Sequence, residues 1–447
     1  MSELIISVSG LRGVVGISLT PDVAVRYACA LAAELPLGTI VITRDGRESG
    51  PMLSAAICSG LTALGRTVID ADVAATPTTG VLIRQFHAAG GIQISASHNP
   101  AEYNGLKLFS AAGRVLPEAV GAKVIDRYRR QGLERSTHDR LGTVQVGADS
   151  IGPHWSLIEK TVDVERVRGH RFKVLLDANH GAGSLLGRKL LSELGCTATL
   201  LGAEPDGRFE HTPEPTAENL SGVLSTVPRL GCDVGFCQDP DADRLAVIDE
   251  SGRYLGEEYT LAICIEQRLR SQQGAIVTNC STSRMAQDLA EKYNVPFFRS
   301  AVGEANVVDA MLEHGAVLGG EGNGGVIDPR VGWVRDSFVG MAMILDAMAQ
   351  RTRTISQLAD ELPRYQIVKT KLSLPQEKTS AALDAVERHF RDAQVDHLDG
   401  LRLDWPRKWL LVRASNTEPI VRAIAEAPTW AEAQRLCDEA QAVMSSL

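Results

Sequence analysis

Short apolar runs alternate along the chain with longer segments whose apolar residues recur at helical spacing. The apolar runs cover residues 39–43, 172–178 and 275–279, and the amphipathic segments that follow them cover 51–65, 181–195 and 283–294. Strands that are apolar throughout, with helices between them, are typical of parallel sheets in α/β units. The pattern therefore predicts a helix after each strand.

These three units recur at intervals of roughly 100–130 residues, which favours a structural repeat. Each has a polar turn after its strand: RDGR at 44–47, NHGAG at 179–183 and CSTS at 280–283. We therefore expect three similar α/β domains with mixed or parallel sheets.

The pattern changes near residue 366. A strand is followed by a helix over 378–391, strands over 409–413 and 420–426, and a helix over 429–446. Two strands joined by a tight loop favour antiparallel pairing, so this part is predicted to be a small α+β domain. The predicted domains cover 1–150, 151–255, 256–365 and 366–447.

Composition and charge narrow the class of protein. The 447 residues include 46 basic and 55 acidic residues, and the net charge of −9 argues against general nucleic-acid binding. A local basic pocket for an anionic small molecule is compatible with that charge. No apolar run approaches the roughly 20 residues that span a bilayer. The beginning, MSELIISVSGLRG, lacks the features of a secretory signal. We expect a cytoplasmic protein without nucleic-acid or membrane partners.

The cysteines form neither a CxxC pair nor a His-linked metal pattern, and most lie in apolar helical or strand segments. Buried free thiols in a reducing compartment explain this arrangement. The eight positions are Cys29, Cys58, Cys196, Cys232, Cys237, Cys264, Cys280 and Cys437.

The segment DVGFCQDPDADRLAVID at 233–249 carries three carboxylates between two apolar strands. Asp239, Asp241 and Asp243 are spaced by two, and on an extended chain such residues point to one side. Converging carboxylates repel one another unless a cation lies between them, and oxygen ligands suit Mg²⁺. Arg244 follows, where it either neutralises the acidic set or reaches a phosphoryl group.

Other interpretations fit part of this pattern. A solvated acidic loop explains paired aspartates without any ligand. An EF-hand is excluded because Arg244 stands where that loop requires glycine, and because strands flank the segment. A phosphatase of the haloacid dehalogenase type, with Asp239 as nucleophile, stays an alternative, although that motif tends to open its domain.

Ser97 lies in ISASHNP at 94–100, directly after a strand-like run. The hydrolase pattern G-x-S-x-G is absent, and a dyad with the adjacent His98 is geometrically awkward. The simplest interpretation is a polar turn residue. A functional role is favoured by the position at the carboxyl edge of a predicted parallel sheet and by the neighbouring basic residues His98 and Lys107.

The segment RASNTEP at 413–419 joins two predicted strands, and Arg422 follows it. Its guanidinium, hydroxyls, amide and backbone N–H groups suit a phosphate dianion. A polar hairpin loop explains the same residues equally well.

Two glycine-rich segments add further candidates. LGGEGNGGVID at 318–328 allows close backbone approach to a ligand and carries Glu321 and Asn323, natural partners for sugar hydroxyls. SGLRGVVG at 9–16 places Arg12 between glycines, where it could contact phosphate. A flexible or structural turn is the alternative in both cases.

ASASHNP, DPDADR, GEGNGG and RASNTEP, in this order, resemble four motifs of the α-D-phosphohexomutases. That superfamily includes phosphoglucomutases, phosphomannomutases and phosphoglucosamine mutases. The resemblance spans nearly the whole chain, and each predicted domain supplies one motif. It implies four domains around a central cleft, and an enzyme that interconverts hexose 6-phosphate and hexose 1-phosphate.

The resemblance also assigns roles to particular residues. Ser97 would carry the phosphoryl group as phosphoserine and contribute an oxygen to Mg²⁺. A hexose 1,6-bisphosphate would be the intermediate and activator. Mg²⁺ would be held by Asp239, Asp241 and Asp243. The transferring phosphate or its proton would be handled by Arg12, His98, Lys107 and Arg244. Glu321 and Asn323 would bind the sugar. The non-reacting phosphate would be bound by Arg413, Ser415, Asn416, Thr417 and Arg422.

The signals for the preferred sugar point in two directions. Many bacterial members read GEMSGH or GEQSGH where this chain has GEGNGG, and SNTEP is similar to the phosphoglucomutase/phosphomannomutase branch. The opening GLRGVVG with LTPDVA resembles the glucosamine enzymes. We expect glucosamine phosphate, with phosphoglucomutase/phosphomannomutase specificity as the alternative and a phosphatase using Asp239 as a more distant one. The oligomeric state is left open.

Overall fold

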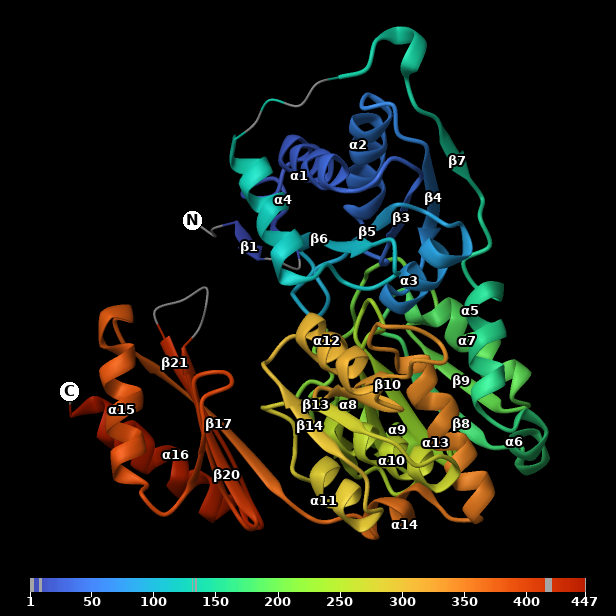
Figure 1. The fold of residues 1–447 in the computed structure, drawn as a ribbon. Coiled ribbons are helices and arrows are strands. Elements are labelled where there is room, and N and C mark those ends of the chain that lie inside the picture. The colour runs from blue at the N-terminus through green and yellow to red at the C-terminus, as the bar shows by residue number, and fades with distance from the viewer. Residues whose placement is uncertain (1–3, 8–9, 131, 133–134, 415–419, 447) are drawn as a thin grey trace. The chain divides into compact units, whose positions relative to one another are not determined.

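The computed structural model describes residues 4–7, 10–130, 132, 135–414 and 420–446 (Figure 1). The chain divides into two compact units, each made of two segments. The first unit comprises Met1–Gln267 and Asn323–Ala359, and the second comprises Arg268–Gly322 and Asp360–Leu447.

A seven-stranded mixed sheet occupies the beginning of the first unit. Its strand order is β1 (Ile5–Ser7), β2 (Gly10–Val14), β6 (Tyr103–Ser110), β5 (Gly90–Ile94), β3 (Ile40–Arg44), β4 (Val68–Val73) and β7 (Val144–Val146). β3 is parallel to β4 and β5, whereas β6 is antiparallel to β5 and β2. The sheet is mixed because β5 continues into β6 through a loop and not through a crossover helix.

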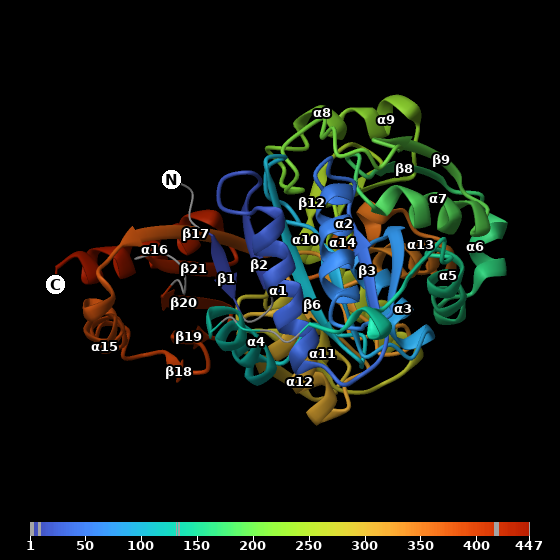
Figure 2. The ribbon, with the colours of Figure 1, turned by 90° about the horizontal axis from the view of Figure 1, so that it is seen from above.

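Helices cover both faces of this sheet, because successive side chains of its buried strands are apolar and point to opposite sides. Ile40 and Ile42 of β3 belong to a core cluster shared with α1 (Pro21–Glu34), α2 (Gly50–Thr62) and α4 (Glu118–Arg130). Val41 belongs to a second cluster shared with α3 (Thr76–Gln85). The helices of both groups can be followed in Figure 2.

The first unit holds a second mixed sheet of five strands. Their order is β12 (Tyr254–Gly256), β11 (Leu245–Asp249), β10 (Val234–Gln238), β8 (Lys173–Asp177) and β9 (Thr197–Leu201). β8 is parallel to β9 and β10, and β10 forms an antiparallel pair with β11. Because β10 and β11 are adjacent and antiparallel, the short segment between them must turn sharply.

Further elements complete the first unit. They are the 3₁₀ turns η1 (His138–Arg140) and η2 (Glu159–Thr161), the strand β16 (Gly325–Ile327), and the helices α5 (Gly152–Ile158), α6 (Val164–His170), α7 (Gly183–Glu193), α8 (Ser221–Leu224), α9 (Thr226–Leu230), α13 (Ser337–Arg351) and α14 (Ile355–Asp360). The helix α10 (Glu257–Ser271) begins in this unit.

The second unit contains α/β and α+β parts. In the α/β part, β13 (Ile276–Asn279) is parallel to β14 (Phe297–Ser300) and β15 (Leu318–Glu321), with helices α11 (Met285–Lys292) and α12 (Glu304–His314). The α+β part is an antiparallel sheet with one 3₁₀ turn and two helices. Its elements are β17 (Gln366–Ser373), β21 (Ile420–Ala427), β20 (Lys408–Ala414), β19 (Leu401–Trp405) and β18 (Gln394–Asp396), in sheet order, with η3 (Gln376–Lys378), α15 (Thr379–His389) and α16 (Trp430–Ser445).

The predicted fold class is confirmed, with α/β architecture first and an α+β part at the end. The predicted strand–helix pairs correspond to β3 and α2, β8 and α7, and β13 and α11, to within a few residues at each end. The strands β18 and β19 were not predicted. In β19, the charged Arg402 and Asp404 alternate with leucines and pair with each other, with a distance of 2.9 Å between Nε and Oδ2.

Trp409 of β20 joins the two parts of the second unit. It is fully buried in a cluster with Cys280 and Leu411. Its indole Nε1 donates to Glu426 Oε1 over 2.8 Å, and the guanidinium carbon of Arg402 lies 4.3 Å from the centroid of its ring. The indole therefore combines apolar burial with a satisfied hydrogen bond.

Replacing Trp409 by alanine is expected to lower the free energy of unfolding by about 3–5 kcal/mol, the usual cost of emptying a large aromatic core position. Trp430 is 60% exposed on α16 and gives a matched control. Trp430→Ala should change the same free energy by less than about 0.5 kcal/mol. Chemical denaturation measures both variants, and equal losses would contradict the packing described for Trp409.

The described cysteines are free thiols, and all except the half-buried Cys196 are buried. Burial raises the pKa of Cys29 to about 11, so this thiol stays protonated. Among the described residues, no helix combines the length and the apolar character needed to cross a membrane.

Candidate active site

Ser97 lies on the loop that leaves β5, at the carboxyl end of a strand that is parallel to β3. The serine is buried, with 1% of its surface exposed. Its φ of 51° is in the left-handed region, which few residues other than glycine adopt. Its backbone N–H donates to Ser95 Oγ over 2.8 Å. The loop thus presents a buried hydroxyl in a strained conformation.

Asp239, Asp241 and Asp243 lie on the turn between β10 and β11. The expectation that they alternate along an extended chain is wrong, because residues 240–243 are in a turn and bend, and Ala242 has a φ of 55°. The turn brings the three carboxylates together instead. All three side chains are fully buried, and one oxygen from each lies within 4.8 Å of the others.

The fold brings Ser97 to this acidic cluster although 142 residues separate it from Asp239. Ser97 Oγ donates to Asp239 Oδ2 over 2.7 Å, and the other oxygen of Asp239 accepts from the backbone N–H of Arg244 over 3.1 Å. Residues predicted separately from two motifs therefore form one site.

Cationic side chains surround the cluster. Lys107 of β6 donates to Asp241 and lies 2.7 Å from Asp243 Oδ2. Arg335 Nη2 lies 2.7 Å from the same oxygen. Arg244 Nε is 3.9 Å from Asp243, and Arg12 Nη1 donates to Asn99 Oδ1 in the Ser97 loop. The site therefore carries enough positive charge to receive a phosphate.

The three carboxyl groups have different proton affinities. Burial, followed by the charges of Asp241 and Asp243, raises the pKa of Asp239 well above its ordinary value. Burial also opposes ionisation of Asp241, but Lys107 and hydrogen bonds from Lys107 and Thr76 outweigh it, so its pKa lies below the ordinary value. The charges around the cluster thus favour ionisation of Asp241, whereas burial and the neighbouring carboxylates disfavour ionisation of Asp239.

The donor set fits a hard divalent cation. In the part of the chain that the structure describes, the Oδ1 atoms of Asp241 and Asp243 are buried and accept no hydrogen bond. Unsatisfied buried carboxylate oxygens are costly, and a cation would satisfy them. Three buried carboxylates and an adjacent hydroxyl offer the oxygen ligands that Mg²⁺ prefers.

His98 approaches Ser97 closely, with 3.3 Å between its Nδ1 and Ser97 Oγ. Burial, helped by Arg244 and Arg12, lowers the pKa of His98 to about 3. The imidazole is therefore neutral at neutral pH and adds no positive charge to the site.

Other predicted site residues belong to the second unit or to the junction between segments. Glu321 ends β15 and accepts from Asn279 Nδ2 over 2.7 Å and from the backbone N–H of Gly303 over 3.2 Å. Arg413 and Arg422 face each other across β20 and β21, and Arg413 Nε lies 3.2 Å from Asp399.

Asn323 begins the second segment of the first unit, so its position relative to Glu321 is not described. Ser415, Asn416 and Thr417 lie outside the described residues. The roles assigned to these positions and to their partners in the second unit remain predictions.

Family descriptions match successive parts of the chain. Phosphoglucomutase/phosphomannomutase alpha/beta/alpha domains I, II and III match residues 4–135, 153–252 and 257–365, and the C-terminal domain of this family matches residues 370–443. The "Phosphoglucomutase/phosphomannomutase" of Thermococcus kodakarensis is 37% identical over 95% of each chain.

The chain belongs to the phosphoglucomutase/phosphomannomutase family.

The resemblance drawn from the motifs is thus confirmed, and the protein is a phosphohexomutase, an isomerase that acts as an intramolecular phosphotransferase. A relative from Methanopyrus kandleri named "Probable phosphoglucosamine mutase" is 34% identical, covering 96% of this chain and 95% of that one. The crystal structure of a phosphoglucomutase/phosphomannomutase family protein from Burkholderia thailandensis is similar, with 27% identity, a TM-score of 0.82 and coverage of 99% and 98%.

The tertiary structure of this phosphohexomutase adds residues that the sequence motifs did not indicate. Arg335 pairs with Asp243, and Thr76 Oγ1 donates to Asp241 Oδ2 over 2.5 Å. Arg47 reaches the Ser97 loop. Arg335 lies just before α13 and Thr76 begins α3, and neither belongs to one of the motifs identified in the sequence. Arg47 lies in the RDGR turn after the first predicted strand, and that turn was identified from the sequence without a role being assigned to Arg47.

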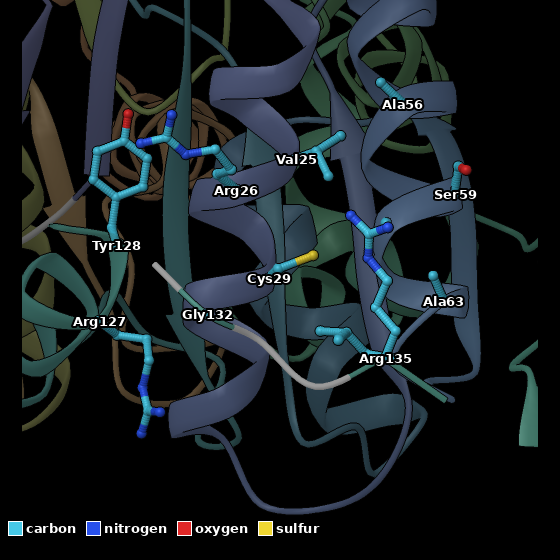
Figure 3. Close-up of a pocket in the computed structure, with 12 residues that line it drawn as sticks. Val25, Arg26, Cys29, Ala56, Ser59, Ala63, Arg127, Tyr128, Gly132 and Arg135 are labelled. Atoms are coloured by element: carbon cyan, nitrogen blue, oxygen red, sulfur yellow. The ribbon is translucent and has the colours of Figure 1, made fainter. Parts of the chain in front are cut away.

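A cavity of about 480 Å³ elsewhere in the first unit holds none of the predicted site residues (Figure 3). It lies along α1, α2 and α4, and Arg26 within it stacks on Tyr128, with 4.8 Å between the guanidinium carbon and the ring centroid. In Figure 3 the side chain of Cys29 points from α1 toward α2. The cavity is therefore separate from the Ser97 and aspartate site of the phosphohexomutase.

Proposed function

We propose that the phosphohexomutase transfers phosphoryl groups through Ser97 while converting hexose 6-phosphate to hexose 1-phosphate and back. One observation carries the proposal: Ser97 Oγ lies 2.7 Å from Asp239 Oδ2, inside a buried acidic cluster that Lys107, Arg335, Arg244 and Arg12 surround. A serine in such a setting is suited to carry a phosphoryl group, because cations neutralise the oxygens of phosphate.

The proposed reaction starts from phosphorylated Ser97. A hydroxyl of the sugar phosphate attacks the phosphorus, the bond to Ser97 Oγ breaks, and a hexose 1,6-bisphosphate forms. The proton of the attacking hydroxyl leaves to a nearby base, and Ser97 Oγ regains a proton. After the bisphosphate has reversed its orientation, its other phosphoryl group returns to Ser97 and the isomeric sugar phosphate is released. The bisphosphate thus acts as intermediate and as activator of any unphosphorylated enzyme.

In this proposal the carboxylates of Asp239, Asp241 and Asp243 would hold Mg²⁺, and phosphorylated Ser97 would offer a further oxygen. When bound, the ion would neutralise charge on the phosphoryl oxygens. In this proposal the transferring phosphate is contacted by Lys107, Arg244 and Arg12. The neutral imidazole of His98 accepts or returns a proton near Ser97 Oγ. Positioning and charge neutralisation are the main demands of phosphoryl transfer.

Further residues are assigned to the sugar and to its non-reacting phosphate. Glu321 is held by Asn279 and the Gly303 N–H, which supports its proposed role with Asn323 as a partner of sugar hydroxyls. We assign the non-reacting phosphate to Arg413, Ser415, Asn416, Thr417 and Arg422. Binding energy at that distant phosphate would orient the reacting hydroxyl.

Glucosamine phosphate is the proposed preferred substrate, in line with the GLRGVVG and LTPDVA segments. Phosphoglucomutase/phosphomannomutase specificity is the second candidate, favoured by the name of the 37% identical relative. The proposal further includes four domains bounded near 150, 255 and 365 and a location in the cytoplasm.

A coupled assay that compares the 1-phosphates of glucose, mannose, glucosamine and N-acetylglucosamine tests the function. The highest kcat/KM is expected for glucosamine 1-phosphate. A higher value for glucose or mannose 1-phosphate would favour the second candidate, and no turnover of any of the four would overturn the proposed function.

Replacing Asn323 by alanine is expected to raise the KM for the preferred sugar about tenfold, because the lost amide leaves a sugar hydroxyl without one partner. The same assay measures the change in KM and in the ratio between sugars. Gln434 on α16 is a half-buried amide whose Nε2 donates to Asp438 Oδ1 over 2.7 Å, and it serves as the control, since Gln434→Ala should change neither quantity. An unchanged KM and sugar ratio in Asn323→Ala would remove this residue from the sugar site.

A further inference from the structure

Arg47 is a buried arginine whose guanidinium reaches the loop that carries Ser97. It follows β3 in the RDGR turn, and only 1% of its surface is exposed. Its Nη2 donates to Ser97 O over 2.7 Å and to Asn99 O over 2.6 Å. Its Nη1 donates to Pro100 O over 2.6 Å and to Tyr103 O over 2.8 Å. One side chain therefore binds three carbonyl groups of the Ser97 loop and the carbonyl of Tyr103, the first residue of β6.

That loop needs such support because its backbone is strained. Ser97 has a φ of 51°, a conformation that non-glycine residues keep only when surrounding contacts hold it. The carbonyl of Ser97 itself accepts from Arg47, so the guanidinium acts directly on the strained residue. Loss of these hydrogen bonds would let Ser97 relax, and its Oγ would move relative to Asp239.

A closed set of hydrogen bonds fixes Arg47 in turn. Its Nε donates to Asp45 Oδ2 over 3.1 Å, and its backbone N–H donates to Asp45 Oδ1 over 3.0 Å. Asp45 also accepts from Ser95 Oγ over 2.7 Å, and Ser95 Oγ accepts from the Ser97 N–H over 2.8 Å. Arg47, Asp45, Ser95 and Ser97 thus form a ring in which each member orients the next.

The loop after β9 covers the guanidinium of Arg47. The ring of Phe209 faces Arg47, with 5.1 Å between its centroid and the guanidinium carbon. Gly207 approaches so closely that a Cβ there would lie 2.7 Å from the Cα of Arg47. Water is kept from the donors on this side, which strengthens their hydrogen bonds to the Ser97 loop.

We propose that Arg47 is a positioning residue, which holds Ser97 Oγ in the geometry for phosphoryl transfer without touching the substrate. The proposal rests on the function proposed for Ser97. Arginine suits the task because its planar fork presents five N–H donors in fixed directions, whereas lysine has three donors on one nitrogen. A lysine at position 47 could keep the charge beside Asp45 but could not reach four carbonyls at once.

Arg47→Lys tests the proposal, with Arg66→Lys as a matched control. Arg66 is another buried arginine of the same sheet region, and it donates to four carbonyls away from the site, those of Ala32, Leu35, Pro36 and Gly38. Both variants lose a similar set of hydrogen bonds. A purely structural role therefore predicts similar effects in both.

We expect Arg47→Lys to lower kcat about 100-fold, the effect of displacing a reacting group by about 1 Å. The KM for the sugar phosphate should stay within about threefold, because Arg47 does not touch the substrate. Arg66→Lys should keep kcat within about threefold. Hydrogen–deuterium exchange of residues 94–104 should rise in Arg47→Lys and stay unchanged in Arg66→Lys.

Equal losses of kcat in the two lysine variants, or unchanged exchange over 94–104 in Arg47→Lys, would overturn the proposal. If Arg47→Lys does not fold, Phe209→Leu replaces it, since it removes the covering ring and keeps Arg47. A smaller rise in exchange over 94–104 is then expected, and its absence counts against the proposal. Absence of mutase activity in the unaltered protein would overturn the proposed function, while the exchange comparison still decides whether Arg47 holds the loop.

Discussion

Ser97→Ala is expected to lower mutase activity by more than about 10⁴-fold, since the residue removed is the group that carries the phosphoryl between two sugars. The hydroxyl lies 2.7 Å from Asp239 Oδ2, and its buried position leaves little room for water to replace it. Intact-mass measurement should find one phosphate on a fraction of the unaltered protein and none on the variant. The coupled assay then measures the loss of turnover.

The control for this variant is Ser110→Ala. Ser110 ends β6 in the same sheet, and its hydroxyl donates only to the backbone carbonyl of Arg114 among the described contacts. Full activity is expected there. An active Ser97→Ala protein without phosphate would defeat the carrier role. Release of inorganic phosphate that survives Ser97→Ala but not Asp239→Ala would instead support a phosphatase with Asp239 as nucleophile.

Asp241→Ala is expected to abolish Mg²⁺ binding and to lower activity about 10³-fold. Two effects combine. The variant loses one of three buried carboxylates that converge within 4.8 Å, and it leaves the Lys107 ammonium without its closest partner. Loss of a preorganised group that stabilises charge in the transition state commonly costs about 10²–10³ in rate. Titration calorimetry with Mg²⁺ measures the first effect, and turnover at saturating Mg²⁺ measures the second.

Asp233→Ala is the matched control for the metal. Asp233 precedes β10 on the same hairpin, is exposed, and accepts from the Lys173 N–H over 2.7 Å away from the cluster. Mg²⁺ binding and turnover should stay unchanged there. Normal Mg²⁺-dependent turnover of Asp241→Ala would show that the acidic cluster is not the metal site.

The α/β architecture could be predicted from the sequence because it depends on the local periodicity of apolar residues. Buried strands such as β3, β8 and β13 read as apolar runs, and each helix after them repeats its apolar residues at helical spacing. The mixture of parallel and antiparallel strands in the first sheet was harder to predict from the sequence. It arises because β6 pairs antiparallel with β5, and pairing direction depends on how the chain returns after the Ser97 loop.

The site shows the same division. Ser97 and the three aspartates lie in conspicuous motifs, and their polar residues between apolar strands mark them locally. Arg335 comes within 2.7 Å of Asp243 only through folding, because 92 residues separate the two. Arg47 lies 50 residues before Ser97, and no local sequence pattern predicts that its guanidinium binds the serine loop.

By itself, the sequence determined the α/β class, the family motifs and the chemical types of the reacting groups, since these depend on residue identity and on spacing within short segments. Only the tertiary structure decided that Ser97 lies against Asp239, that a turn and not an extended strand gathers the aspartates, and that Arg47 and Phe209 support the serine loop. The reason is physical. Contacts between distant segments depend on how the sheets that carry them pack. The residues of one short segment do not specify which distant segment will contact it.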